Sequence, residues 1–498
     1  MLSLKLSVSA SEPSWPEDRL LPVFPPPAAV LDCIDLSSLS GAEADLFASL
    51  QGIVNRAQPR IVCVSQGDGE GKFTWVDLHG LRYRVINGYE AILKYRTALA
   101  GLVVTDPSQP HTLNLATVMA GVNEELICDP SLLPKLAQKP FNLRPIDDLR
   151  QRFTEPQAVY RLLYSNYWNK CSHRMIAGMD PHDHGFLRDY LVALKVATIW
   201  LNPGREADAR LLRGFVSDLP AVRGIYLGWW PDEGSGLQWI ARYGIPVLAS
   251  DFLRNATVFC AVPREVHPAD IPPLPRLENK VYVAFILSDG DNIQYMQHFM
   301  KLDWQSQARG AVPIGWTVSP LAVDLDPGML SYYWNTATGN DCLISGPSGA
   351  GYAHVQEWSR TNLSAFARLT DSYLRRSGLR IITVWDRVND NIAQTFAAKC
   401  PTLLGLTDQS GTYHKTDNGL RTIALTPTYT SSIGELLAGI TNAAAGWNGA
   451  KPMFIIGQAD VWNVGPTGLV KAARELDPGR YRLVRPDQLF LLCHAGGD

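Results

Sequence analysis

Two aspartates separated by a glycine carry the sharpest chemical signal in the sequence. The segment Asp289-Gly290-Asp291-Asn292 directly follows the apolar run Val281–Leu287, which is typical of a buried strand. Two carboxylates at the end of a strand can act as a nucleophile or as a general acid/base pair. They can equally coordinate Ca²⁺ or Mg²⁺ through their oxygens, whereas a turn that caps a helix needs only one of them. The sequence leaves these three interpretations open.

A second acidic segment lies among tryptophans and glycines. Residues 229–236, with the sequence WWPDEGSG, follow the expected strand Gly224–Gly228. Packing against tryptophan would raise the pKa of Glu233, and a general acid that works near neutral pH needs such a shift. The alternative is a loop in which Gly234 and Gly236 simply allow a tight turn.

Polar and aromatic residues also follow the other strands expected in the C-terminal half. Carboxylates and amides can bond sugar hydroxyls, and aromatic rings stack on the flat faces of sugars. Asp386 is a second candidate for a general acid, although Asp386, Asp408 and Asp460 could each be a helix N-cap instead. The side chains expected to contact a carbohydrate substrate are Asn292, Trp316, Tyr352, His354, Trp385, Gln458, Asp460 and Trp462.

Two further motifs indicate other chemistry more weakly. Residues 346–350 (GPSGA) nearly match the G-x-S-x-G nucleophile elbow, which would make Ser348 the nucleophile of an acyl hydrolase. His182 and His184 flank an aspartate and could bind a metal ion. The eight cysteines form no C-x-x-C pair, which argues against a structural zinc site.

The elements that must position these residues alternate between strands and helices. Seven or eight strands in about 220 residues, most of them followed by helical sequence, predict a closed or nearly closed β/α barrel. An open doubly wound sheet is the alternative. In a barrel, the residues that follow the strands meet at one mouth. The expected strands are Val281–Leu287, Ile314–Val318, Cys342–Ser345, Arg380–Trp385, Thr402–Leu406, Thr422–Leu425, Met453–Gly457 and Tyr481–Val484.

Composition shifts divide the 498 residues into a small-domain half and a barrel half. The predicted fold class is α/β, with small N-terminal α/β domains followed by a C-terminal (β/α)7–8 barrel-like domain. We expect a proline-rich arm at 1–28, an α/β region at 29–150, a helix-rich α/β domain at 151–262, a proline-rich linker at 263–279 and the catalytic barrel at 280–495.

Charge and hydropathy exclude several classes of protein. The 45 Lys and Arg against 48 Asp and Glu give a net charge of −3, which argues against a nucleic-acid partner. No apolar run reaches the roughly 18 residues of a membrane span. The first 15 residues form a poor export signal, so we expect a cytoplasmic protein unless such a signal has been trimmed or mis-annotated. The sequence gives no indication of the oligomeric state.

One further segment resembles a known family. Residues 349–355 (GAGYAHV) are similar to the motif that names the GxGYxYP "putative glycoside hydrolase" family, and other matching segments occur in order along the chain. His354 and Val355 stand where the family has Tyr and Pro. The resemblance implies small N-terminal domains before a barrel-like domain, and hydrolysis of glycosidic bonds. The other matching segments are 50–61, 187–190, 227–233 and 287–292.

Together, these observations predict a glycan-active hydrolase without a cofactor. Asp289 or Asp291 would be the nucleophile or base, and Glu233 or Asp386 the general acid. One alternative is a metal-dependent hydrolase, for example a carbohydrate deacetylase, with Asp289, Asp291 and a His as metal ligands; Ca²⁺ or Mg²⁺ could bind at Asp289 and Asp291. The other is a glycan-binding protein that uses the aromatic residues alone.

Overall fold

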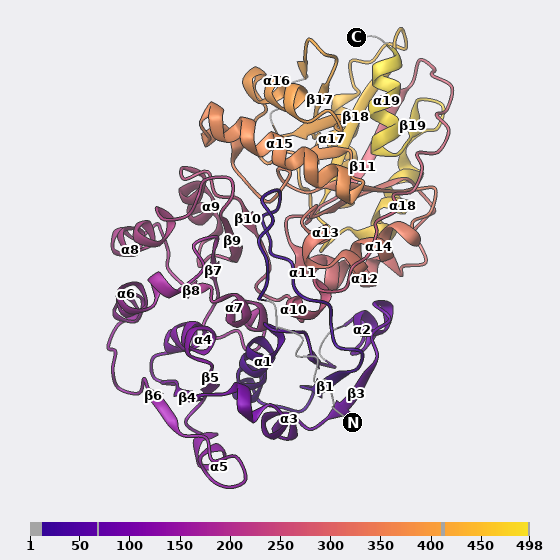
Figure 1. The fold of residues 1–498 in the computed structure, drawn as a ribbon. Helices are drawn as coiled ribbons and strands as arrows, with labels where there is room; N and C mark the ends of the chain where they lie inside the picture. The colour runs from indigo at the N-terminus through magenta and orange to yellow at the C-terminus, as the bar shows by residue number, and fades with distance from the viewer. Residues whose placement is uncertain (1–11, 67–68, 410–413, 497–498) are drawn as a thin grey trace, which may run out of the picture.

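The computed structural model describes residues 12–66, 69–409 and 414–496. Three small parallel sheets form in the N-terminal half of the chain, and one large sheet forms in the C-terminal half. Figure 1 shows the indigo-to-magenta N-terminal elements on one side of the molecule and the orange and yellow C-terminal elements on the other. Within the described residues, no helix is both long enough and apolar enough to cross a membrane.

The proline-rich arm is tied down along its described part. Residues 1–11 of the expected arm lie outside the described residues. Further along, Leu20 and Leu21 are buried in the core. The backbone N–H of Leu20 donates to the hydroxyl of Tyr373 at 2.9 Å, which anchors the arm to the C-terminal half.

Short parallel strands alternate with helices in each of the three small domains. The sheet orders are β2-β1-β3, β5-β4-β6 and β10-β9-β7-β8. In the first domain, Ser40 caps helix α1 and exchanges hydrogen bonds with Glu43, which satisfies otherwise unpaired backbone N–H groups. The elements of the first domain are β1 (Leu31–Asp35), α1 (Gly41–Asn55), β2 (Ile61–Val64), α2 (Thr74–Leu78), β3 (Tyr83–Ile86), α3 (Gly88–Lys94) and the 3₁₀ helix η1 (Arg96–Ala98).

The second and third domains divide the next 160 or so residues between them. The expected helix-rich stretch also contains strands β7 and β8, whose four- and three-residue apolar runs are too short to distinguish from buried helix by periodicity. The elements of the second domain are β4 (Gly101–Val104), α4 (Thr112–Asn123), β5 (Glu125–Cys128), α5 (Leu133–Ala137), β6 (Pro145–Asp148), α6 (Pro156–Asn166) and η2 (Trp168–Lys170). Those of the third are β7 (Met175–Gly178), α7 (Arg188–Leu194), β8 (Ala197–Ile199), α8 (Glu206–Val216), β9 (Ile225–Gly228), α9 (Glu233–Ala241), β10 (Val247–Leu248) and α10 (Ala256–Phe259).

Seven parallel strands form a nearly closed barrel in the C-terminal half. The order is β17-β15-β14-β13-β12-β11-β18, and isolated parallel bridges from Leu425 to Ile456 and from Thr430 to Ala459 join its two ends. This confirms the barrel-like fold class over an open sheet. The strands are β11 (Val281–Leu287), β12 (Ile314–Val318), β13 (Asp341–Ser345), β14 (Ile381–Thr383), β15 (Gly405–Asp408), β17 (Arg421–Ala424) and β18 (Met453–Ala459), with β16 (His414–Lys415) and β19 (Tyr481–Leu483) at the periphery.

Helices cover the outside of the barrel, and all seven residues of β11 are therefore buried. Strand β15 lies about three residues later than expected, so Asp408 ends the strand rather than following it. The barrel helices are α11 (Ile293–Gln297), α12 (Phe299–Trp304), α13 (Ala322–Leu325), α14 (Pro327–Asn335), η3 (Val355–Glu357), α15 (Arg360–Ser377), α16 (Asp390–Lys399), α17 (Ile433–Ala443), α18 (Gly465–Glu475) and α19 (Pro486–Gly496).

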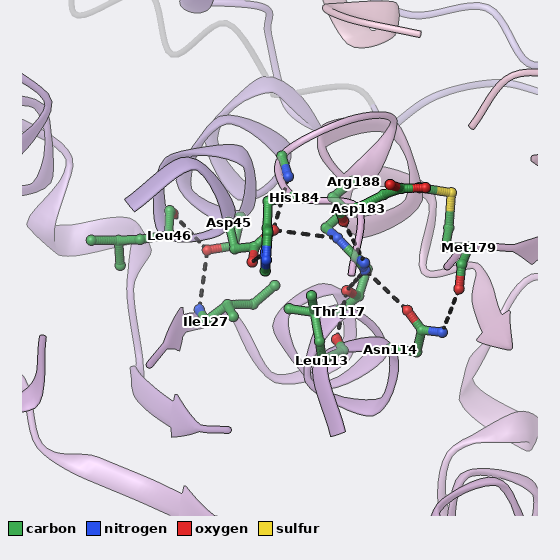
Figure 2. A network of polar contacts seen from close by, with 12 residues as sticks. Asp45, Leu46, Leu113, Asn114, Thr117, Ile127, Met179, Asp183, His184 and Arg188 are labelled. Atoms are coloured by element: carbon green, nitrogen blue, oxygen red, sulfur yellow. Dashed lines mark hydrogen bonds and ion pairs between the residues drawn. The ribbon is translucent and has the colours of Figure 1, made fainter. Parts of the chain in front are cut away.

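A buried polar network joins the three small domains (Figure 2). The guanidinium of Arg188 on α7 donates to Thr117 on α4 at 2.7 Å and lies 3.4 Å from a carboxylate oxygen of Asp45 on α1. The Nδ1 atom of His184 lies 2.6 Å from the other Asp45 oxygen. Arg188 is fully buried, and an unpaired buried guanidinium would be costly, so this network fixes the domains relative to one another. His184 is thus part of a domain contact.

Strand β10 of the third domain pairs directly with loops at the mouth of the barrel. Val247 and Tyr352 exchange two backbone hydrogen bonds of 2.9 and 2.8 Å. The N–H of Ile293, at the start of α11, donates to the carbonyl of Ala249 at 2.9 Å. These backbone bonds hold the third domain against the barrel mouth.

Candidate active site

A cavity of about 400 Å³ opens where the third small domain meets the barrel mouth. Its walls come from the segments that follow several barrel strands and from the loop between β9 and α9. The residues that line it are Trp229, Glu233, Ser288, Asp289, Gly290, Asp291, Asn292, Thr317, Pro347, Tyr352, Trp385, Tyr429, Gln458 and Trp462.

Asp289 sits on a strained backbone that neighbouring groups hold in place. Its φ angle is +137°, a region that residues with a side chain rarely adopt and that often marks functional sites. The Thr317 hydroxyl accepts the N–H groups of Asp289 and Gly290 at 3.0 and 2.9 Å and donates to the Leu287 carbonyl at 3.0 Å. The carboxylate accepts a hydrogen bond from the Asn292 amide at 3.2 Å.

Asp289 and Asp291 both resist ionisation. Desolvation raises the pKa of Asp289, and the nearby charges of Glu233 and Asp460 add to the shift, while hydrogen bonding to Asn292 opposes it. Desolvation, followed by repulsion from Asp289, raises the pKa of Asp291 well above its usual range. Two close carboxylates that do not ionise independently are suited to roles that need one protonated and one ionised group.

Glu233 reaches the same cavity from the other domain. It is the first residue of α9, exposed at the rim, while Asp232 caps the helix by accepting the N–H of Ser235 at 2.8 Å. Partial desolvation raises the pKa of Glu233, and the nearby His354 opposes that rise. The helix-start position therefore places a carboxyl group with a raised pKa in the same cavity as the two aspartates.

Asp386 lies behind the cavity rather than in its wall. It is 4% exposed, and one carboxylate oxygen lies 2.7 Å from Nδ1 of His354 while the other accepts the N–H of Gln356 at 3.2 Å. The prediction that Asp386 is a general acid is therefore not supported by its position. It orients His354, which also lies outside the cavity wall but close enough to act on Glu233.

Aromatic rings form much of the cavity wall. Trp385 packs edge-on against Tyr352 and Tyr429, with ring centroids 6.3 and 5.7 Å away, and Trp462 is 46% exposed. Trp229 packs near Tyr352 from the third domain, with centroids 6.5 Å apart. These rings offer flat faces of the kind that sugars stack on.

Trp316 does not belong to this wall, and the prediction that it contacts substrate is wrong. Its side chain is fully buried, its indole N–H donates to Asp341 at 2.9 Å, and its ring packs edge-on against Trp304. Successive side chains of a strand point to opposite faces. Because Thr317 faces the cavity, Trp316 faces the helices outside the barrel.

The three remaining polar candidates differ in the hydrogen bonds that their side chains already form and in whether they line the cavity. Gln458 lines the cavity, is 2% exposed, and its side-chain oxygen has no hydrogen-bond partner among the described residues. Asn292 caps α11 by accepting the N–H of Tyr295 at 3.0 Å, in addition to its bond with Asp289. Asp460 accepts the N–H of Trp462 at 2.8 Å and lies outside the wall, so it acts on the site through Trp462 and through its charge.

The residues of the nucleophile-elbow motif have a structural role. Ser348 is fully buried, and its hydroxyl donates to the Ala353 carbonyl at 2.9 Å and accepts the Trp385 N–H at 3.3 Å. It is therefore not a free nucleophile. Across residues 12–66, 69–409 and 414–496, no group of three or more His, Cys, Asp or Glu side chains is arranged to hold a metal ion.

Comparison with known proteins identifies the family. The chain matches the GxGYxYP "putative glycoside hydrolase C-terminal domain" over residues 279–494, the GxGYxYP third domain over 173–261 and the GxGYxYP_N second domain over 99–171. This protein belongs to the GxGYxYP family. No curated protein matches the chain.

A crystal structure of a "putative hydrolase" from Bacteroides thetaiotaomicron VPI-5482 has the same fold as this chain. It matches with a TM-score of 0.85 at 20% identity, covering 98% of this chain and 99% of the other. A "putative polysaccharide deacetylase" from Mycobacterium smegmatis and a family 18 chitinase from Crocus vernus match far less well, with TM-scores of 0.33 and 0.23 at 12% identity. They cover 46% and 42% of this chain, and 96% and 93% of their own.

The GxGYxYP motif itself forms the turn that carries Tyr352 into the cavity. Gly349 and Gly351 have φ angles of +122° and +106°, and a Cβ at Gly349 would lie 2.7 Å from the side chain of Thr370. Only glycine fits such a position without strain. Beyond the turn, His354 replaces the family Tyr and pairs with Asp386.

Six residues of the wall were not predicted as site residues: Trp229, Ser288, Gly290, Thr317, Pro347 and Tyr429. Trp229 and Tyr429 follow expected strands, so the same strand-end rule could have selected them. Thr317 lies one residue inside its strand, and no local signal distinguishes it from Trp316 beside it. Its role depends on which face of β12 turns toward Asp289.

Proposed function

We propose that this protein hydrolyses glycosidic bonds in the cavity between its third small domain and its barrel. One observation carries the proposal: three carboxyl groups with raised pKa values, on Glu233, Asp289 and Asp291, meet in one cavity walled by aromatic rings. Glycoside hydrolysis typically uses a protonated carboxyl and an ionised carboxylate on either side of the scissile bond. The family name supports the same class of reaction.

In this proposal, Glu233 is the general acid. It gives its proton to the glycosidic oxygen as the bond to the anomeric carbon breaks, and the bonding electrons leave with that oxygen. Asp289 or Asp291 either attacks the anomeric carbon or takes a proton from a water that attacks it. In the first case the covalent glycosyl-enzyme is then hydrolysed by a water that Glu233 deprotonates, which frees the carboxylate again. The strained backbone at Asp289 fixes the direction of that carboxylate, because Thr317 holds its N–H.

The cavity wall would bind the sugar. Trp385, Trp462 and Tyr352 offer ring faces or edges, while Gln458 offers an unpaired amide oxygen to a sugar hydroxyl. His354, held by Asp386, would tune Glu233 rather than contact the reacting atoms.

The test is a panel of aryl glycosides and oligosaccharides, with the native protein beside Glu233→Gln and Asp291→Asn, each with and without EDTA. Turnover that persists in EDTA and falls by about 100-fold or more in both variants is expected for acid/base catalysis. Asp303→Asn is the matched control, because burial also raises the pKa of Asp303, to about 6, but this residue does not line the cavity.

Two outcomes would contradict the proposal, and a third would change the assignment of the acid. Loss of turnover in EDTA alone would support the metal-dependent alternative, with Ca²⁺ or Mg²⁺ at Asp289 and Asp291. Sugar binding without turnover of any substrate would support a glycan-binding protein. Equal turnover in Glu233→Gln and Asp303→Asn would remove Glu233 from the mechanism.

A further inference from the structure

The cavity wall contains acids but no basic side chain. Glu233, Asp289 and Asp291 are its charged residues, and no Lys, Arg or His appears among its described lining residues. In the described part of the chain, none of these three carboxylates forms an ion pair. His354 lies outside the wall, and its Nδ1 atom is 2.7 Å from a carboxylate oxygen of Asp386. A ligand in this cavity therefore meets three carboxyl groups and no basic side chain among the described lining residues.

Two other buried acids of the protein have cationic partners: Asp341 pairs with Arg309 at 2.5 Å, and Asp487 pairs with Arg485 at 2.5 Å. Buried Asp189 instead accepts hydrogen bonds from the hydroxyl and N–H of Thr257. Buried charges normally have such partners because desolvation is otherwise costly. Among the described residues that line the cavity, no such cationic partner is present.

The rest of the wall also favours a cation. Trp229, Tyr352, Trp385, Tyr429 and Trp462 all contribute to the lining. The face of an aromatic ring carries negative electrostatic potential, and rings grouped around a cavity bind ammonium groups. The unpaired side-chain oxygen of Gln458 adds an acceptor that an N–H donor can reach.

We propose that the sugar bound in this cavity carries a free amino group, so that the substrate is a glycoside of an unacetylated amino sugar. This inference rests on the proposed function and specifies its substrate class. The ammonium group supplies the counter-charge that the carboxylates lack. A uronic acid or a sulfated sugar meets repulsion at the same place, and an N-acetyl group removes the positive charge.

Proton release should accompany binding. Desolvation and mutual repulsion keep the aspartates partly protonated in the empty cavity, and an ammonium group favours their ionised forms. Calorimetry of glucosamine or galactosamine binding in buffers of different ionisation enthalpy should therefore detect released protons. Glucose in the same buffers is the control and should release fewer.

The decisive experiment compares four probes of similar size: glucosamine, glucose, N-acetylglucosamine and glucuronate, and the corresponding galacto series. We expect the amino sugar to bind about tenfold or more tightly than the neutral sugar, and glucuronate to bind least. Glu233→Gln at the exposed rim and Asp289→Asn in the interior should each reduce the preference for the amine. Two variants are used so that a folding defect in one does not hide the result.

A separate test asks whether the cavity recognises an amino sugar or any small molecule with an ammonium group. Putrescine and choline carry the charge without a sugar ring, so tighter binding of either than of the amino sugars would overturn the assignment of a carbohydrate. Equal or tighter binding of N-acetylglucosamine or glucuronate would overturn the inference itself.

The two proposals fail in different ways. Amino-sugar preference without turnover of any glycoside would leave this inference standing while removing the proposed hydrolysis. Turnover of neutral or acidic glycosides without a preference for the amine would leave the hydrolysis standing and remove this inference.

Discussion

Removal of the Thr317 hydroxyl should destabilise the fold more than removal of the hydroxyl of Thr383 or Thr407, two similar threonines in the barrel. Thr317 accepts the N–H groups of Asp289 and Gly290 and donates to one carbonyl. Thr383 donates one hydrogen bond, to the Ser345 carbonyl at 3.1 Å. The Thr407 hydroxyl has no partner among the described residues. All three threonines are buried in strands of the same barrel, so replacement by valine changes the hydrogen bonds and little else.

The expected costs follow from the bonds lost. In Thr317→Val, the N–H groups of Asp289 and Gly290 lose their acceptor. Each unpaired N–H group costs about 1–3 kcal/mol. Because the backbone can partly relax, the free energy of unfolding should fall by about 2–4 kcal/mol in total. Thr383→Val leaves one carbonyl unpaired and should cost about 1 kcal/mol, whereas Thr407→Val should be neutral or stabilising. The free energy of unfolding of each variant, from urea titration at constant m-value, measures these differences.

Thr317→Val should also lower catalytic activity by more than its loss of stability explains. The strained φ of Asp289 is held by the bond to Thr317, so its loss lets the carboxylate change direction. We expect kcat on the best glycoside to fall about tenfold or more, with little change in the other two variants. If Thr317→Val matches Thr407→Val in both stability and kcat, the reasoning about the Asp289 support is refuted.

Three further predictions concern charge and packing. His354 lowers the pKa of Glu233, so in His354→Gln the alkaline limb of kcat/KM should move to higher pH by a fraction of a unit. A shift to lower pH would contradict the assignment of Glu233 as the acid. Burial raises the pKa of Asp303 from 3.8 to about 6, so its folded form favours the proton and stability falls as pH rises through this window. Asp303→Asn should therefore stabilise the protein at pH 8, by about 1–2 kcal/mol after allowance for its partial exposure, and change little at pH 4; thermal melts at both values check this. Trp316→Phe should lower stability by about 2–3 kcal/mol without changing sugar affinity. Trp462→Ala should weaken sugar binding with little effect on the melting temperature. A loss of sugar affinity in Trp316→Phe alone would contradict the core position of that ring.

Much of the fold was predictable because its determinants are local. Apolar runs of four to seven residues alternate with amphipathic helical sequence in the C-terminal half, and parallel strands with helical connections close most readily into a barrel. For β11 and β12 the predicted and observed bounds agree. The small strands β7 and β8 were missed because a buried run of three or four residues has no period to detect.

The sequence by itself determined that Asp289 and Asp291 lie at the mouth of the barrel. They directly follow a fully apolar strand, and the ends of parallel strands share one rim. The same rule placed Tyr352, Trp385, Gln458 and Trp462 in the cavity wall, and all four line it.

Only the tertiary structure decided which of the remaining candidates reach the cavity. Glu233 belongs to another domain, and backbone pairing of Val247 with Tyr352 brings it to the barrel mouth. Asp386 turns to His354 instead of the cavity, and Trp316 turns outward because the next residue, Thr317, faces in. A strand-end position fixes where a residue lies along the barrel axis. The direction of its side chain depends on the register of the strand and on which partner neutralises its charge, and both are set by contacts between distant parts of the chain.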